Sequence, residues 1–521
     1  MTASRAPCYG SVVSRRLTGV VPLLVALAGT SVIAPAHAET PRHAQKPAKK
    51  KGAKPGGKKP PAPPVAPPPA TPPRVTTTPT PTRVISLSVE RLTLENGLRV
   101  VLAPDARAPV VAVSIVYDVG ARDEDRGATG LSRLLGRAFS SGSANVLRGE
   151  HERLIAARAG ESWVSSSTDR LMATDVAPAG ELPLLLWLEA DRMKSLQLGI
   201  EAIEASRRAL LAERQTEDGS PAGAGRARLR ELVFQASFPL EHDPRGALAD
   251  IAALRPEAVR ALYEARCSAS NAVLTLTGDF EVDHAVSLVH RFFDTAKKQD
   301  RPAPSASPPL PEQTSERVAT LDDPRARATT LLFGWSLPPI GTDDHDALEA
   351  AVDALAVGPG SRLGRLPFPL RALGTVERHR GPGLLTLELT LPEDANRADV
   401  TKAALAEIEA LAKTGPSDAE LAAYRAHHEA ATWATLADPA ERAQRLAATE
   451  LSVGDARALT AELPRAAALT RDRVKAAVAR WLAPTRRSSV EVGPPRDDAP
   501  APKPAAPPPG PPRTPRPRGH R

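Results

Sequence analysis

The side chains that could carry chemistry here lie on one short segment, GLSRLLGRAFSSGS at 130–143, and on one acid farther along the chain. Arg133 and Arg137 are four residues apart, so on a helix their side chains share one face. Two histidines at this spacing with a glutamate between them bind zinc and position a general base. Arginine stays protonated and Gly136 has no side chain, so these positions supply neither a zinc ligand nor a base. Glu213, 76 residues beyond Arg137, is a carboxylate that guanidinium groups can pair with.

Helices and strands must hold these side chains, and the apolar pattern locates them. The segment 128–140 carries the arginines, the segment 200–218 carries Glu213, and both have helical spacing. The expected strands, rich in β-branched residues, are 99–102, 110–117, 329–335, 383–391 and 488–492. The other expected helices are 147–159, 180–197, 256–266, 281–296, 345–356, 399–413, 417–433, 438–451, 454–464 and 470–481.

The order of strands and helices in 86–297 is repeated in 319–493, which indicates an internal duplication. We therefore expect two folded domains with these boundaries, joined by a Pro-rich linker at 298–318. A cleaved signal peptide is expected at 1–38, because Arg15 and Arg16 precede an apolar run that ends at Ala36-His37-Ala38. This predicts a periplasmic or secreted protein, exported by either the general or the twin-arginine route.

The segments 39–85 and 494–521 are rich in Pro with Lys or Arg, which predicts a disordered linker and a disordered tail. Of the net charge of +8, residues 1–38 carry +3, residues 39–84 carry +9 and residues 494–521 carry +4, which leaves −8 between them. The basic balance therefore describes the tails, which can bind an anionic envelope surface. It gives no support to nucleic-acid binding by the folded part.

Cysteine and histidine offer little further chemistry. Cys8 falls within the signal peptide and Cys267 then has no partner, so we expect Cys267 to be a packed, inert thiol. Neither His151, between two glutamates, nor the pair His427-His428 has partners at metal-binding spacing in the sequence. Solvated helix faces are expected for all three.

Residues 92–143 resemble the opening of the pitrilysin/insulinase-like zinc metallopeptidases, the family of mitochondrial processing peptidase. An N-G-L strand, a G-S-R-x-E segment and a following helix occur in the same order in that family. The resemblance continues over about 88–493. The matching segments are Asn96–Leu98, Gly120–Glu124, Gly130–Leu131, Ser206–Glu213, His242–Gly246, Ser270–Phe280 and Gly358–Leu363.

The resemblance implies an α+β fold of two homologous domains, each a mixed sheet with helices, facing each other as a clamshell. It places Arg133, Gly136 and Arg137 at the positions of H-x-x-E-H, and Glu213 at the position of the third zinc ligand. Zinc is expected for the family and predicted to be absent here. If the family geometry holds, both arginines point at Glu213 across the former metal site and replace the dication.

The resemblance also locates two segments that grip substrate in active members. The family's N-A-x-T strand corresponds to Ser162–Ser165, so Ser162 and Val164 are candidate substrate-binding residues. In the second domain, Arg371 matches the family's arginine, whereas the tyrosine position holds Glu377. Both segments depart from the family pattern.

Three functional hypotheses follow. The first is a non-catalytic homologue, a pseudoenzyme that serves as subunit or scaffold for an active zinc-bearing homologue in a hetero-oligomer. The second is a stand-alone peptide-binding or envelope-associated protein held by its basic tails. The third is a residual zinc metallopeptidase with unconventional ligands.

Overall fold

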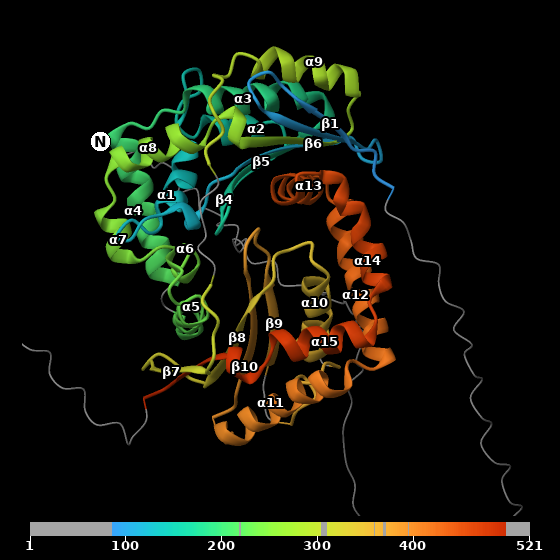
Figure 1. The fold of residues 1–521 in the computed structure, drawn as a ribbon. Coiled ribbons are helices and arrows are strands. Elements are labelled where there is room, and N and C mark those ends of the chain that lie inside the picture. Colours follow the sequence, from blue (N-terminus) through green and yellow to red (C-terminus); the bar gives the residue numbers. More distant parts are fainter. Residues whose placement is uncertain are drawn as a thin grey trace, which may run out of the picture. The chain divides into compact units, whose positions relative to one another are not determined.

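The computed structural model describes residues 86–217, 220–303, 310–358, 360–367, 371–393 and 395–495 (Figure 1). The expected signal peptide at 1–38, the expected linker at 39–85 and nearly all of the expected tail at 494–521 lie outside the described residues. Within those ranges, no helix has both the length and the hydropathy that a membrane span requires.

Six strands of the first half form one mixed sheet in the order β1-β2-β6-β3-β5-β4. Strands β2 and β6 are parallel and all other neighbours are antiparallel. The central strands β3 and β6 are buried almost throughout, as expected for strands covered on both faces. The bounds are β1 Glu90–Thr93, β2 Arg99–Pro104, β3 Val110–Tyr117, β4 Glu161–Ser166, β5 Leu171–Pro178 and β6 Ala272–Gly278.

Five strands of the second half form a sheet in the order β7-β11-β8-β10-β9. The last strand of this half, β11, is parallel to β7 and antiparallel to β8, as β6 is to β2 and β3. The two halves therefore share one strand order, which supports the duplication expected from the sequence. The bounds are β7 Arg317–Asp322, β8 Thr330–Leu337, β9 Arg371–Glu377, β10 Gly383–Thr390 and β11 Ser488–Gly493.

Helices cover both sheets, and the fold is the expected mixed α+β type. In the first half they are α1 Leu131–Ala138, α2 Glu150–Ala156, α3 Leu182–Ser195, α4 Ile200–Glu217, α5 Pro221–Val233, α6 Phe238–Glu241, α7 Leu248–Ala253, α8 Pro256–Arg266 and α9 Val282–Phe293. In the second half they are α10 Asp343–Ala356, α11 Arg397–Thr414, α12 Asp418–Ala437, α13 Pro439–Val453, α14 Glu462–Ala468 and α15 Arg471–Trp481. Short 3₁₀ helices occur at η1 Ala121–Asp123, η2 Phe139–Ser141, η3 Ala179–Glu181, η4 Ala269–Asn271, η5 Ala456–Ala461 and η6 Pro484–Arg486.

One helix from each half packs on the sheet of the other half. Helix α13 packs on β3, β6 and β5 of the first sheet, whereas α5 packs on β11, β8 and β7 of the second (Figure 1). Gly225 makes the second contact possible, because a Cβ there would lie 2.5 Å from Val492 Cγ2 and 2.6 Å from Leu332 Cδ1. The described residues of both halves belong to one compact unit.

Charged side chains reinforce the same junction. The fully buried Arg442 of α13 donates to Asp105 Oδ2 at 2.6 Å and to the Leu436 carbonyl at 2.8 Å. The turn after β9 also reaches the first half, where the Arg380 guanidinium donates to both carboxylate oxygens of Asp118 at 2.5 and 2.7 Å. Both pairs join residues more than 260 positions apart, so they form only when the whole chain folds.

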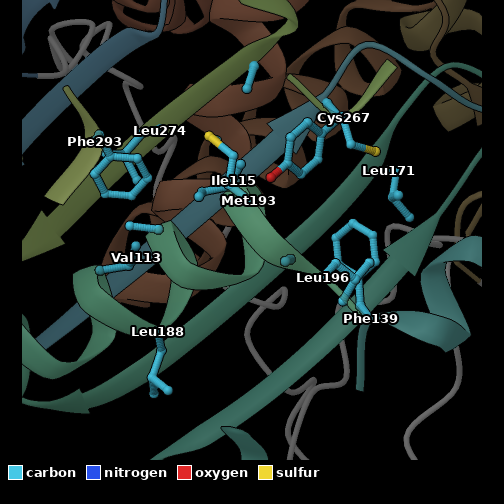
Figure 2. Close-up of a cluster of buried hydrophobic side chains, with 14 of the residues drawn as sticks. Val113, Ile115, Phe139, Leu171, Leu188, Met193, Leu196, Cys267, Leu274 and Phe293 are labelled. Carbon is cyan, nitrogen blue, oxygen red and sulfur yellow. The ribbon is translucent and has the colours of Figure 1, made fainter. Parts of the chain in front are cut away.

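The largest apolar core lies between the first sheet and its own helices. It joins strand residues such as Val113, Ile115 and Leu274 to Leu188, Met193 and Phe293 from α3 and α9 (Figure 2). Each fully buried side chain of this size contributes roughly 1.5–3 kcal/mol. Cys267 lies in this cluster and is free, and burial raises the pKa of its thiol, as expected for an inert residue.

The apolar pattern located most helices but fewer than half of the strands. Strands β1, β5, β7 and β9 and the short helices α6 and α7 were not expected, and β4 and β6 were located only by the resemblance. The segment 454–464 holds η5 and only the start of α14, and β7 begins within the expected linker. Helix α5 was missed, because its sequence PAGAGRARLRELV is rich in small and charged residues and lacks a continuous apolar stripe. Its helical state depends on packing against the second half's sheet.

We predict that Arg442→Ala lowers the free energy of unfolding by about 2–4 kcal/mol, because it removes a buried partner of Asp105 and opens space under α13. Arg107→Ala is the matched control, since Arg107 pairs with the same carboxylate but its side chain is 73% exposed. The control should cost at most about 1 kcal/mol. Urea unfolding of both variants checks this, and equal losses would show that the cross-half pair contributes nothing.

Candidate functional site

Helices α1 and α4 pack side by side and bring the predicted site residues together (Figure 1). Arg133 Nη2 lies 2.8 Å from Glu213 Oε1, and Arg137 Nη2 lies 2.9 Å from Glu213 Oε2. One carboxylate is thus held between two guanidinium groups that lie one helical turn apart. The contact expected from the family geometry is confirmed.

Glu217 is a fourth member of this cluster that the sequence analysis missed. It lies one turn beyond Glu213 on α4, and its carboxylate accepts from both terminal nitrogens of Arg133 at 2.7 and 3.0 Å. The i, i+4 spacing of Glu213 and Glu217 was a signal for it, since both then lie on one helix face. Two arginines and two glutamates leave the cluster with no net charge.

Burial makes this balance important. The side chain of Arg133 is only 13% exposed and that of Glu213 is 31% exposed. Burial lowers the pKa of Arg133, but Glu217 and Glu213 raise it by more, so the guanidinium is firmly charged. Arg137 is 46% exposed and forms the open side of the cluster.

Gly136 faces the sheet and has little room for a larger side chain. A Cβ at this position would lie 3.0 Å from Leu171 Cδ1 and 3.6 Å from Val164 Cγ1. A glutamate at position 136 would therefore require Leu171 to shift. The position expected for a general base thus lacks a carboxylate and lies against Leu171 and Val164.

The donor set does not fit zinc. A structural or catalytic zinc ion takes imidazole nitrogen, thiolate or carboxylate ligands, and a guanidinium group has no lone pair to offer. Glu213 alone provides a suitable oxygen among the four family positions, and both its oxygens accept from arginine. We derive no catalytic step through a metal at this site, and the absence of zinc stays a prediction.

The segments around the site act as its frame. Glu124 caps α1, accepting at 2.8 Å from the backbone N–H groups of Gly130 and Ser132. His242 Nε2 lies 3.3 Å from the same carboxylate. Burial lowers the pKa of His242, but its hydrogen bonds to Glu124 and to the Phe238 carbonyl raise it above the ordinary value.

Two glycines allow the loop that carries His242 to meet the start of α1. Gly130 and Gly246 have φ of +87° and +80°, and a Cβ on Gly246 would lie 2.5 Å from the Cα of Gly130. Only glycine fits both the conformation and the contact. The segments that resemble G-S-R-x-E and H-P-x-G thus position α1.

The candidate substrate-binding residues lie on the two edge strands. Ser162 and Val164 are half-buried in β4, and Val164 packs against the core next to Gly136. Arg371 is exposed at the start of β9, whereas Glu377 ends the same strand. Six residue steps at about 3.3 Å place their backbones ~20 Å apart. A substrate-binding role for Ser162, Val164 and Arg371 stays a prediction.

Glu377 belongs to the junction between the halves. It pairs with Arg230 of α5, and His379 Nε2 lies 3.2 Å from its carboxylate. Burial raises the pKa of Glu377, but Arg230 and His379 lower it to about 2. The position that would hold the family's tyrosine is therefore occupied by an internally paired acid.

The expectation of a solvated helix face was wrong for His151, whereas the His427 side chain is 36% exposed. His151 is buried and its Nε2 lies 2.9 Å from Asp175 Oδ2. His427 is hydrogen-bonded to Asp353 at 2.9 Å, and burial lowers the pKa of His428. The partners come from other elements, so spacing within the sequence gave no sign of them.

Comparison with known families identifies the class of protein. Residues 99–242 match the model described as Insulinase (Peptidase family M16), and residues 253–366 match the model described as Peptidase M16 inactive domain. The chain therefore belongs to the pitrilysin/insulinase-like family.

Individual relatives agree with this assignment. The chain is 26% identical over 277 residues to the zinc protease PqqE of Helicobacter pylori, an alignment that covers 53% of this chain and 62% of that relative. It is 24% identical over 423 residues to an uncharacterized zinc protease of Mycobacterium tuberculosis, covering 78% and 94% of the two chains.

Solved structures share the fold. A protease from Helicobacter pylori matches with a TM-score of 0.74 at 22% identity, covering 78% of this chain and all of that one. The first half of the periplasmic protease PqqL from Escherichia coli matches with a TM-score of 0.65 at 14% identity, covering 79% and 93%. At these identities the likeness establishes the fold alone.

We predict that Glu213→Ala lowers the melting temperature clearly more than Glu201→Ala, an exposed acid on the same helix. The expected loss is about 1–2 kcal/mol, because two guanidinium groups lose a shared, half-buried partner. Thermal unfolding followed by circular dichroism measures both. Equal melting temperatures would contradict a stabilising role for the cluster.

Proposed function

We propose that this protein is a non-catalytic member of the insulinase-like family that serves as a subunit or scaffold for an active zinc-bearing homologue. The observation that carries the proposal is the ion-pair cluster of Arg133 and Arg137 with Glu213. At the positions where a family member binds metal, this chain has a neutral, internally satisfied set of charges. Such a cluster needs no ion and leaves no group to activate water.

The rest of the site supports the same proposal. The frame of α1, with Glu124, Gly130, His242 and Gly246, is retained although the chemistry is lost. This frame holds α1 in the place that the family geometry gives it. Retention of the frame fits a protein whose shape is still used, as when it pairs with a related chain.

Export is the second part of the proposal. It rests on the signal sequence expected at 1–38 and on the structural likeness to the periplasmic protease PqqL of Escherichia coli. The partner would then be a zinc-bearing homologue in the same compartment. Peptide binding along the edge strand β4, with Ser162 and Val164, is compatible with this role.

We predict that the tagged mature chain, isolated from its own envelope extract, co-elutes with a homologue that contains H-x-x-E-H. The eluate should cleave peptides in a chelator-sensitive way, whereas the chain purified alone should not. An inactive eluate with no homologue would favour a stand-alone binding or envelope protein. Activity of the chain alone that depends on metal would favour a residual peptidase.

A gain-of-ligand variant tests the zinc part separately. Arg133→His with Arg137→His would join Glu213 in a His₂Glu set, which is a known catalytic zinc arrangement. We predict about one equivalent of zinc in this double variant and a substoichiometric amount in the unmodified chain, measured by elemental analysis after dialysis. Stoichiometric zinc in the unmodified chain that survives Glu213→Ala would show that metal binds elsewhere.

A further inference from the structure

A second buried polar cluster lies in the first half, within the layer of helices that covers the sheet. It joins His151 of α2, Asp175 of β5, and Glu189 and Arg192 of α3, all of them 5% exposed or less. His151 Nε2 is 2.9 Å from Asp175 Oδ2, and Arg192 forms an ion pair with Glu189. One ligand-type atom from each of His151, Asp175 and Glu189 lies within 4.8 Å of the others.

The charges of this cluster balance only when it holds one exchangeable proton. Asp175 and Glu189 together carry two negative charges, and Arg192 supplies one positive charge. The remaining charge is cancelled either by a proton on a carboxylate or by a proton on His151. Both arrangements contain the same number of protons. The cluster is therefore neutral whichever group carries the exchangeable proton.

A net charge in this place would be costly. The side chains are removed from water, and a charged group in such surroundings needs a partner to remain ionised. Asp175 Oδ1 and Arg192 Nη1 already lack hydrogen-bond partners among the described residues. The cluster is therefore sensitive to the gain or loss of a single proton.

The direction of the shifts in pKa agrees with a shared proton. Burial raises the pKa of Asp175, but His151 and Arg192 lower it to about 2, so this carboxylate stays ionised. Burial raises the pKa of Glu189 and the charge of Arg192 lowers it, but with the further upward effect of Asp175 the pKa lies well above its ordinary value. Glu189 is the carboxylate that can hold the proton at neutral pH.

A divalent metal ion is the alternative occupant, and the charge count disfavours it. With His151 neutral, the four groups sum to −1, so a proton brings the cluster to zero whereas a dication brings it to +1. The dication would also lie next to Arg192, which already occupies the carboxylate of Glu189. The proton satisfies the same oxygens without that repulsion.

The cluster fixes an element that matters for the rest of the half. Helix α2 buries only His151 and Ile155 of its seven residues, and it packs on β4, β5 and η2. Strand β4 is the edge of the sheet and follows α2 in the chain. Strand β4 is held on one side by its ladder with β5, and it also contacts α2, which the cluster joins to β5 and α3.

We propose that His151, Asp175, Glu189 and Arg192 form a proton-sensitive cluster. In its neutral, one-proton state the cluster fixes α2, and through it the edge strand β4. Gain or loss of a proton loosens both elements. In acid, the cluster takes up a second proton and becomes +1. In alkali, the shared proton leaves and the cluster becomes −1. This inference concerns the single chain and does not rest on the proposed scaffold role.

Other titratable groups also lie near this cluster, and one of them, Glu152, has a buried Oε2 without a hydrogen-bond partner among the described residues. Glu150 and Glu152 are on α2 itself, and Glu161 begins β4 on the exposed surface. Tyr117 of β3 faces Arg192, and burial raises the pKa of its phenol well above the ordinary value, so it stays neutral.

Amide hydrogen exchange of the full chain as a function of pH tests the proposal, after correction for the intrinsic pH dependence of exchange. The opening of α2 and β4 should be rarest at one pH and should rise on both sides, by up to about tenfold per pH unit, as one uncompensated proton requires. His151→Gln should abolish the rise in acid and Glu189→Gln the rise in alkali. His290→Gln is the control, because it removes an exposed His–Asp pair on α9 and should change neither limb.

The outcomes separate clearly. Profiles that are unchanged in His151→Gln and Glu189→Gln would overturn the proposal. Metal binding would also overturn it. The decisive result would be about one equivalent of zinc or manganese in the purified chain, together with a chelator that lowers the melting temperature of the unmodified chain but not that of His151→Gln. If either variant fails to fold, the profile of the unmodified chain decides, since a rise on one side only contradicts a neutral one-proton state.

Discussion

The carboxylate of Glu213 faces α1 across the gap between two packed helices, and a half-buried carboxylate in that place requires a cation. In a zinc peptidase of this family the metal ion meets that need. Here Arg133 and Arg137 meet it, with Glu217 balancing the second guanidinium. The same helix pair is held together by charge in either case, which explains how the site can lose its metal ligands while the surrounding fold persists.

The frame around the site follows from the same constraint. Helix α1 has to present its face to α4, so its start is fixed by the cap from Glu124 and by the contact of Gly130 with Gly246. These residues position a helix and carry out no chemistry. They lie in segments that resemble the peptidase family in sequence, and their role here is to hold α1 in place.

The two halves are built on one strand order and exchange one helix each, so neither sheet is covered by its own half alone. Helix α13 shields strands β3, β5 and β6, and α5 shields β7, β8 and β11. Buried charge pairs such as Arg442 with Asp105 follow from this exchange, because an arginine lying between layers must find a carboxylate from the opposite half. Stability of the site region is thus coupled to folding of the second half.

The sequence determined the family, the α+β class and most helices, and it predicted that Arg133, Gly136 and Arg137 supply no zinc ligand. Apolar spacing and residue type carry this information locally, so Arg133, Gly136 and Arg137 could be judged without coordinates. The tertiary structure decided which groups meet. Glu217 joins Arg133 from 84 residues away, and His151 meets Asp175 and Glu189 from three different elements. Helix α5 likewise lacks a continuous apolar stripe in its sequence, and it packs on the second half's sheet. Such contacts depend on the packing of distant segments, which local sequence pattern does not encode.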